Sequence, residues 1–347
     1  MRKKQLFQHK MLSEIHQQPT ALSKTWDETW IEASQIAHKN ASNVRMIYFT
    51  GSGTSYHACI AANYAVSSAT DYSSSTLPAS EFSSWTGRTR HQSGTLLIAI
   101  SQSGESRDIT DAATSARRSR MQVLAVTNNA RSKLAKLADF SITSQAGKEE
   151  AVTATKSFTA TLMATYEFLT ALAKREELAS DLRRIPSLVD ETLRICEDKC
   201  RMLASKFRDR EFFFLLGSGS NYATALEGAL KLKESCNVYA EGFATREFLH
   251  GPMQLVDRRT PILILQRDSS EEISELAERF KRLGAPTIIV EPHTSGIEGD
   301  VIETAGDVEE MFQPLTYVIP LQLFAYYSSI SRGLNPDRPS KLKKVVR

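Results

Sequence analysis

The sequence predicts an α/β fold in which two tandem doubly wound parallel-sheet domains are followed by a C-terminal tail. Short apolar runs alternate with polar helical stretches, which is typical of a parallel sheet with helices on both faces. In addition, the hexapeptide GSGTSY that begins at Gly51 returns as GSGSNY at Gly217, 166 residues later. Solenoid units repeat every roughly 20–50 residues. The longer period therefore indicates a duplicated domain.

The repeat extends beyond the glycine-rich turn. At the same offset, Glu81-Phe82 returns as Glu247-Phe248, and the apolar run at 96–98 corresponds to 262–264. One residue drops out later, so the run at 123–125 matches 288–290. The expected organisation is an N-terminal helical segment at 1–40, a first domain at 41–185, a second at 186–332 and a tail at 333–347.

The strands and helices follow in order along the chain. Short apolar or β-branched runs predict buried parallel strands. In the first domain these lie at 45–50, 95–101, 121–127 and 140–143, with helices at 107–119, 130–137 and 155–172. A charged helix at 176–207 is expected to bridge the two domains. The second domain is expected to have strands at 212–216, 261–265 and 287–290 and a closing helix at 314–332.

Composition excludes several classes of function. A net charge of +3 and the lack of a dense Lys/Arg block argue against nucleic acid as a partner. No apolar run reaches the roughly 18 residues of a membrane span, and no secretory signal is visible. The cysteines show no CxxC spacing or completed metal site, so we expect reduced packing residues in a cytoplasmic protein. They are Cys59, Cys196, Cys200 and Cys236.

A hydroxyl-rich loop follows the strand expected at 95–101 and precedes a helix. The helix N-terminus contributes roughly +0.5 of an elementary charge, so hydroxyls beside it form a pocket suited to phosphate. The turn after Gly51 adds hydroxyls from the neighbouring strand end. The loop is no Walker motif, and it carries no GxGxxG pattern. The alternative is a serine-rich helix cap without a ligand. The candidate hydroxyls belong to Thr54, Ser55, Ser101, Ser103 and Ser106.

The second copy differs at this loop. Residues 103–106 correspond to 269–272, where acidic side chains replace hydroxyls. Asp268, Glu271 and Glu272 would repel a phosphate. We therefore expect one anion site per chain, in the first copy.

An acid–base face is predicted in the second copy. Glu227, Lys231 and Glu234 lie at i, i+4 and i+7, so a helix places them on one face. The alternative is an exposed salt-bridged surface. His250 lies in a turn before Gly251-Pro252, and a histidine near such a pair can move protons to a sugar oxygen.

These residues resemble the SIS (sugar isomerase) family. The resemblance runs nearly end to end and includes GTSY at 53–56, TKSF at 155–158, ALEGALKLKE at 225–234, HGP at 250–252 and RPSKLKK at 338–344. The chain is most similar to the isomerase half of the glutamine–fructose-6-phosphate aminotransferases and to free-standing glucosamine-6-phosphate deaminases. The resemblance implies tandem flavodoxin-like domains that bind phosphosugars.

The resemblance also implies roles for individual residues. Glu234 is expected to move a proton between C1 and C2 of the sugar, with Lys231 as its electrostatic partner. His250 is expected to open the sugar ring in the site of a neighbouring subunit, which implies a homodimer. Lys344 is expected to close over the sugar, whereas the role of Glu227 stays open. The implied phosphate and sugar ligands are Ser55, Ser101, Gln102, Ser103 and Ser106. No metal or organic cofactor is required.

The pattern departs from the family in several places. The glutaminase half and its nucleophilic cysteine are absent, so we expect no release of ammonia from glutamine. Ala154 stands where the pattern has a serine, and Ser218 where it commonly has arginine. The leading hypothesis is an enzyme that converts glucosamine 6-phosphate to fructose 6-phosphate and ammonia. The alternatives are a deglycase or isomerase for another phosphorylated ketose or amino sugar, and a phosphosugar-binding regulator.

Overall fold

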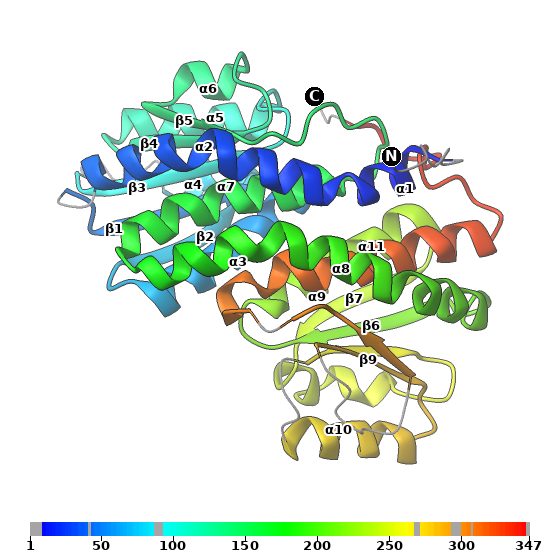
Figure 1. Cartoon of the computed structure of the whole chain (residues 1–347). Helices are drawn as coiled ribbons and strands as arrows, with labels where there is room; N and C mark the ends of the chain where they lie inside the picture. The colour runs from blue at the N-terminus through cyan, green and yellow to red at the C-terminus, as the bar shows by residue number, and fades with distance from the viewer. Residues whose placement is uncertain are drawn as a thin grey trace.

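Two five-stranded parallel sheets form the framework of the chain (Figure 1). The strand order is β2-β1-β3-β4-β5 in the first sheet and β7-β6-β8-β9-β10 in the second. The computed structural model describes residues 9–40, 43–86, 93–266, 271–292, 300–306 and 308–344. Because each copy has the same order of five strands, the duplicated, doubly wound α/β fold predicted from the repeat is confirmed.

The first copy contains β1 to β5 and four of the helices that flank them. The strands are β1 (Met46–Gly51), β2 (Ser73–Pro78), β3 (Thr95–Ser101), β4 (Gln122–Thr127) and β5 (Phe140–Thr143). The helices are α3 (Thr54–Ala69), α4 (Ala79–Trp85), α5 (Arg107–Arg118) and α6 (Lys133–Leu137). Thr50 pairs with Leu77 of β2 and Ala99 of β3, so these three strands end at one edge of the sheet.

The second copy repeats this arrangement, with two 3₁₀ turns between β7 and β8 where the first copy has α4 between β2 and β3. Its strands are β6 (Phe212–Gly217), β7 (Tyr239–Ala244), β8 (Ile262–Leu265), β9 (Thr287–Glu291) and β10 (Asp300–Glu303). Its helices are α9 (Asn221–Cys236), α10 (Glu271–Arg282) and the 3₁₀ turns η1 (Glu247–Leu249), η2 (Pro252–Leu255) and η3 (Glu310–Phe312).

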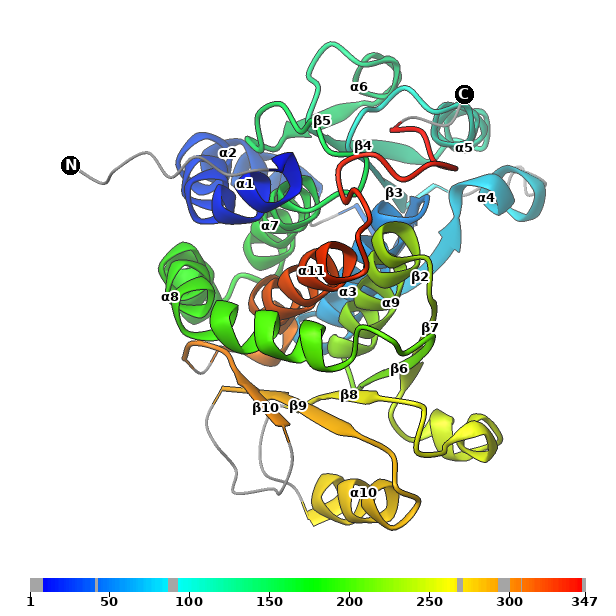
Figure 2. The same ribbon diagram turned by 90° about the vertical axis from the view of Figure 1, so that its right-hand side faces the viewer.

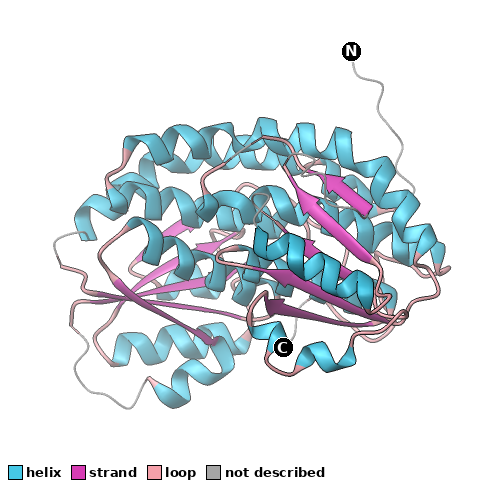
Figure 3. Cartoon of the chain, turned by 90° about the horizontal axis from the view of Figure 1, so that it is seen from below, coloured by secondary structure: helices cyan, strands magenta, loops and turns pink. Residues whose placement is uncertain are grey.

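A layer of long helices separates the two sheets (Figures 1 and 2). It contains α2 (Gln18–Asn40), α7 (Lys156–Ala173), α8 (Glu176–Lys206) and α11 (Gln313–Ser331), and the short α1 (Lys10–His16) leads into it. Helices cover both faces of the strands (Figure 3). One apolar cluster runs through both copies, and α7 is buried on nearly every side. The two copies therefore share a core.

The C-terminal tail is fastened to the N-terminal helix. The two carboxylate oxygens of Asp337 accept hydrogen bonds from the backbone N–H groups of Lys10 and Met11, at 2.9 and 2.8 Å. The carbonyl of Asp337 accepts from the backbone N–H of Val152 at 3.0 Å. Asp337 thus satisfies N–H groups at the start of α1, which have no partner within the helix.

The strands expected from apolar runs are all present, but three edge strands were missed. β2, β7 and β10 each lie at an edge of a sheet, and β2 has the sequence SSSTLP. An edge strand can keep polar residues because one side of it meets solvent. The four cysteines are buried and free, which confirms their prediction as packing residues. Within the described residues, no helix is long and apolar enough to cross a membrane.

Glu167 is a carboxylate inside the helical layer. It lies on α7, is fully buried and accepts a hydrogen bond from the Thr29 hydroxyl of α2. Its other oxygen has no hydrogen-bond partner among the described residues. Burial favours the neutral acid and raises the pKa of Glu167 to about 8 from the usual 4.5. Glu167 therefore keeps its proton near neutral pH.

Glu167→Gln is expected to stabilise the protein increasingly as pH rises from 4.5 to 8. Over this interval the unfolded chain releases a proton that the folded chain keeps, so wild-type stability falls with pH. The glutamine does not titrate, so at pH 7 the unfolding free energy of Glu167→Gln is expected to have gained about 3 kcal/mol over that of wild type, relative to pH 4.5. Urea denaturation at pH 5, 7 and 8 measures it, with the exposed Glu28→Gln on α2 as control. A difference that does not change with pH would contradict the prediction.

Candidate active site

The two glycine-rich turns share a positive φ at their second glycine. Gly53 and Gly219, 166 residues apart, both have φ of 55°, a left-handed value that glycine adopts without strain. Gly51 and Gly217 pass so close to the following helix that a Cβ atom would lie 2.8 Å and 2.2 Å from its backbone. Each turn thereby connects the first strand of a copy to the N-terminus of α3 or α9.

A small cavity of about 60 Å³ lies at the carboxyl ends of β1 and β3. Ligands of doubly wound sheets bind at this edge. The cavity contains three of the residues expected to bind the phosphosugar: Thr54, Ser55 and Gln102. Ala154, where the family pattern has a serine, also lines it. The remaining lining residues are Ser52, Ala58, Ile100, Ser157, Phe158 and Thr161.

The loop from Ser101 to Ser106 is braced by its own hydroxyls. The backbone N–H of Gly104 donates to Ser101 Oγ at 3.1 Å, and the N–H of Glu105 donates to Ser103 Oγ at 3.3 Å. Ser106 lies at the N-cap of α5, and its hydroxyl makes no capping bond. Ser103 and Ser106 lie outside the lining described for the cavity. The loop therefore offers the unused Ser106 hydroxyl and the N-terminus of a helix beside the cavity.

The corresponding loop of the second copy is only partly described. Residues 267–270, including Asp268, lie outside the described residues, and so does the side chain of Glu271. Glu272 pairs with Arg246 at 2.7 Å. The expected exclusion of phosphate from this loop stays a prediction.

The predicted acid–base residues form one connected cluster. The ammonium of Lys231 lies 3.1 Å from Glu227 Oε1 and 2.7 Å from Glu234 Oε2. It also donates to Thr54 Oγ1 at 3.1 Å, and the Thr54 hydroxyl donates to Glu227 Oε1 at 3.0 Å. The cluster thus joins α9 of the second copy to the cavity in the first. The alternative of an exposed salt-bridged face is wrong for Glu227 and Lys231, which are fully buried.

His57 is a further member of this cluster, and it was not predicted. Its Nδ1 lies 2.7 Å from Glu227 Oε2. Burial acts to raise the pKa of Glu227, but the Lys231 ammonium and the His57 hydrogen bond outweigh burial and hold this pKa below its usual value. Glu227 is therefore a buried carboxylate with donors on both oxygens.

Lys231 is held permanently charged. Burial acts to lower its pKa, but the carboxylates of Glu227 and Glu234 outweigh burial and raise the pKa above the ordinary lysine value. Its three N–H bonds match three acceptors, so the ammonium is held in a fixed position. Glu234, whose side chain is 21% exposed, is the carboxylate of the cluster that solvent reaches.

The duplicated fold has counterparts among known proteins. The SIS domain family matches the chain twice, over residues 42–171 and 206–332. The chain belongs to the SIS domain family. The glutamine–fructose-6-phosphate aminotransferase (isomerizing) of Methanothermobacter thermautotrophicus is 35% identical over 349 residues, 98% of this chain and 58% of the relative. The SIS chain thus spans somewhat more than half the length of this curated relative.

Solved structures share the arrangement of the two SIS copies. The C-terminal domain of glucosamine-fructose-6-phosphate aminotransferase from Francisella tularensis has a TM-score of 0.87 at 28% identity, covering 97% of this chain and 100% of that one. Glucosamine-6-phosphate deaminase from Thermotoga maritima has a TM-score of 0.80 at 23% identity, covering 97% and 99%. The second likeness shows the fold alone.

His250 lies apart from the SIS acid–base cluster. It is exposed in the turn between η1 and η2, and its side chain makes no hydrogen bond with any described residue. One chain does not bring His250 to Glu234 or Lys231. Its expected place in the site of a neighbouring subunit stays a prediction.

Lys344 reaches the SIS site through a buried glutamate that was not predicted. Its ammonium donates to Glu149 Oε2 and to the carbonyl of Ala151, both at 2.6 Å. The Ser157 hydroxyl, which lines the cavity, donates to the same oxygen of Glu149 at 2.7 Å. Burial acts to raise the pKa of Glu149, but Lys344 outweighs it and lowers this pKa. One carboxylate therefore links the tail to the cavity wall.

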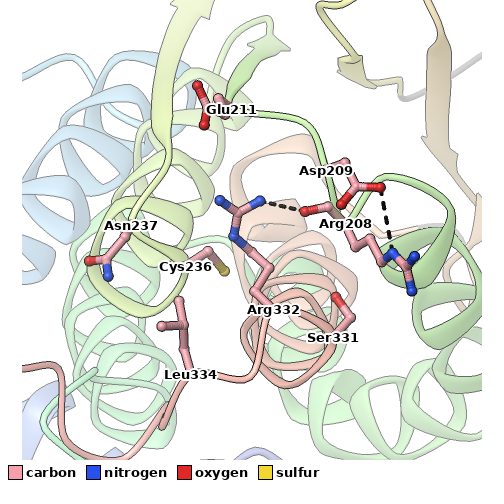
Figure 4. Close-up of a pocket in the computed structure, with 8 residues that line it drawn as sticks. All are labelled: Arg208, Asp209, Glu211, Cys236, Asn237, Ser331, Arg332 and Leu334. Carbon is pink, nitrogen blue, oxygen red and sulfur yellow. Dashed lines mark hydrogen bonds and ion pairs between the residues drawn. The ribbon is translucent and has the colours of Figure 1, made fainter.

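A wider groove of about 550 Å³ lies at the end of the second SIS sheet where strand β6 begins (Figure 4). Its arginines are engaged within the protein, since Arg332 donates to the carbonyls of Arg208 and Arg210, and Arg208 pairs with Asp209 at 3.5 Å. It lies beyond the amino end of β6, away from the ligand-binding edge. We assign it no catalytic role.

His57 and Glu149 had different signals in the sequence. His57 follows Thr54 by three residues, so helical spacing alone places both on one face of α3. Glu149 lies in an irregular loop after β5, where no periodicity applies.

Among the described residues, no group of three His, Cys, Asp or Glu side chains is placed to hold a metal ion.

Proposed function

We propose that the chain converts glucosamine 6-phosphate to fructose 6-phosphate and ammonia. The observation that carries this proposal is the cluster of Glu234, Lys231 and Glu227 beside a hydroxyl-lined cavity. Aldose–ketose interconversion needs a base that moves a proton between adjacent carbons and a cation near the developing oxygen charge. The similarity to aminotransferases named for fructose 6-phosphate supports this sugar class.

The proposed reaction uses each part of the site. The phosphate binds at the Ser101–Ser106 loop and the Thr54-Ser55 turn. Glu234 takes the proton from C2 of the open-chain aldehyde and returns it to C1. The oxygen at C1 takes up a proton and the amine at C2 gives one up, so that C1 becomes an alcohol and C2 an imine. Water then hydrolyses the imine to the ketone and releases ammonia. Lys231 stabilises the negative charge that develops on the oxygen at C1.

Two further parts of the proposal concern the assembly and the tail. His250 of the partner subunit opens the sugar ring in a homodimer, and the tail brings Lys344 over the sugar. The position of Lys344 beside the cavity wall supports the second role. Four buried, free cysteines support a reducing cytoplasm as the location.

A second candidate is a deglycase or isomerase for another phosphorylated ketose or amino sugar. Ala154 favours it, because a methyl group lines the cavity where the family pattern has a hydroxyl. A phosphosugar-binding regulator is the third candidate, and the solvent-accessible carboxylate beside a fixed cation disfavours it.

A panel of phosphosugars tests these candidates together. Ammonia from glucosamine 6-phosphate supports the deaminase, whereas isomerisation without ammonia supports the second candidate. Thermal stabilisation by a phosphosugar without turnover supports the regulator. Absence of both turnover and stabilisation across the panel would overturn the phosphosugar assignment.

Ser106→Ala is expected to raise KM for the phosphosugar by about 10–100-fold with little change in kcat. The expected loss is that of one hydrogen bond to a charged group, about 1.5–3 kcal/mol. The Ser106 hydroxyl makes no capping bond, so its removal leaves the loop intact. Steady-state kinetics measure the effect, with Ser67→Ala on the exposed face of α3 as control. An unchanged KM would remove Ser106 from the phosphate site.

A further inference from the structure

The hydrogen bond between His57 and Glu227 connects the acid–base cluster to the first copy. His57 lies on α3 of the first copy, whereas Glu227, Lys231 and Glu234 lie on α9 of the second. The contact is short, at 2.7 Å, and its two side chains are 14% and 0% exposed. It is thus a well-shielded hydrogen bond between the two copies.

Lys231 is shared between two carboxylates, and His57 contacts one of them, Glu227. Glu227 Oε1 already accepts from Thr54 and Lys231, while Oε2 accepts from His57. Without a donor on Oε2, the buried Glu227 carboxylate would have fewer partners for its charge. Lys231 would then be drawn towards Glu227 and away from Glu234, 2.7 Å on its other side.

The repeat shows that the histidine of this contact is present in the first copy alone. At the offset of 166 residues, His57 corresponds to Ala223 of α9, and Thr54 corresponds to Ser220. Ala223 is buried and has no group that donates a hydrogen bond from its side chain. The histidine therefore accompanies the acid–base cluster rather than the fold.

We propose that His57 is a positioning residue for the isomerisation: by donating from Nδ1 to Glu227, it leaves Lys231 in place against Glu234. This inference rests on the proposed function. It assigns His57 no contact with the sugar and no proton transfer. Because His57 and Thr54 lie one turn apart on α3, the same helix that lines the cavity also holds the acid–base cluster.

Two substitutions separate the hydrogen bond from the bulk of the ring. His57→Leu removes the donor and keeps much of the volume. His57→Asn places an amide N–H at the position of Nδ1 without a titrating ring. We expect His57→Leu to lower kcat by about 10–100-fold with KM unchanged, the size of a lost hydrogen bond to a charged group. His57→Asn is expected to recover kcat to within a few-fold of wild type.

His38→Asn is the matched control. His38 is exposed on α2, and its Nδ1 contacts the carbonyl of Ser34 in its own helix at 2.7 Å. We expect wild-type kcat and KM for this variant. A merely structural role of His57 would not give a change confined to kcat, nor a rescue by asparagine.

A stability cycle tests the same contact without turnover. The unfolding midpoints of His57→Leu, Glu227→Gln and the double variant are compared by thermal denaturation. We expect the unfolding midpoint of the double variant to fall by less than the sum of the two single decreases, because each single substitution removes the same hydrogen bond between His57 and Glu227. Additive losses would overturn the inference.

The outcomes distinguish this inference from the proposed function. An inactive wild type contradicts the proposed function, and the stability cycle then still decides whether His57 and Glu227 are coupled. An active wild type with an equally active His57→Leu variant contradicts the inference alone. A His57→Asn variant as slow as His57→Leu also contradicts it, because the donor would then not be the cause.

Discussion

Glu234→Gln is expected to lower kcat for the conversion of glucosamine 6-phosphate by about 10²–10⁴-fold, the range of general acid–base catalysis. Glutamine has the same shape and keeps an oxygen for the Lys231 ammonium, now 2.7 Å from Glu234. It cannot accept and return the proton that moves between C2 and C1. KM is expected to stay near the wild-type value, because the proposed phosphate site lies in the first copy. Steady-state kinetics with each variant measure both constants.

Glu241→Gln is the matched control for this prediction. Glu241 is exposed on β7 in the same copy, so its substitution removes a carboxylate without touching the site. Wild-type turnover by Glu234→Gln would exclude Glu234 as the base and direct attention to Glu227. An unfolding midpoint close to that of wild type is needed before a loss of turnover is assigned to chemistry.

The fold was predictable where burial leaves a mark on the sequence. β3 and β4 are buried along nearly their whole length, so they read as continuous apolar runs. β2 has the sequence SSSTLP and lies at the edge of its sheet, so no apolar run marks it. Helix α7 was predicted as one long element, and its all-round burial reflects its place between two sheets. The repeat then required that both copies share one topology.

The site was predictable only within single elements. Helical spacing placed Glu227, Lys231 and Glu234 on one face, and the structure brings them together. The contact of His57 with Glu227 spans 170 residues, and that of Lys344 with Glu149 spans 195. Contacts across such distances depend on how two copies and a tail pack. No periodic pattern within one helix or strand encodes them.

The burial of Lys231 leads to the second large effect, on stability. Lys231→Met is expected to destabilise the protein by about 3–5 kcal/mol, the cost of leaving buried carboxylates without their cation. Methionine fills a similar volume, so a cavity is not the cause. Glu227 is fully buried beside the substituted position, and its negative charge would face Glu234 without Lys231 between them. Urea denaturation at pH 7 measures the loss.

Two comparisons show whether charge is the cause of that loss. Without Lys231, burial would dominate and raise the pKa of Glu227, so the variant is expected to recover part of its stability as pH falls and Glu227 takes up a proton. Adding Glu227→Gln to Lys231→Met removes the unpaired charge directly and is expected to recover a similar part at pH 7. If Lys231→Met were as stable as wild type at pH 7, or if neither low pH nor Glu227→Gln restored stability, an unpaired buried charge would not be the cause of the loss. The restored double variant is still expected to be inactive, because Glu234 would lack its fixed cation.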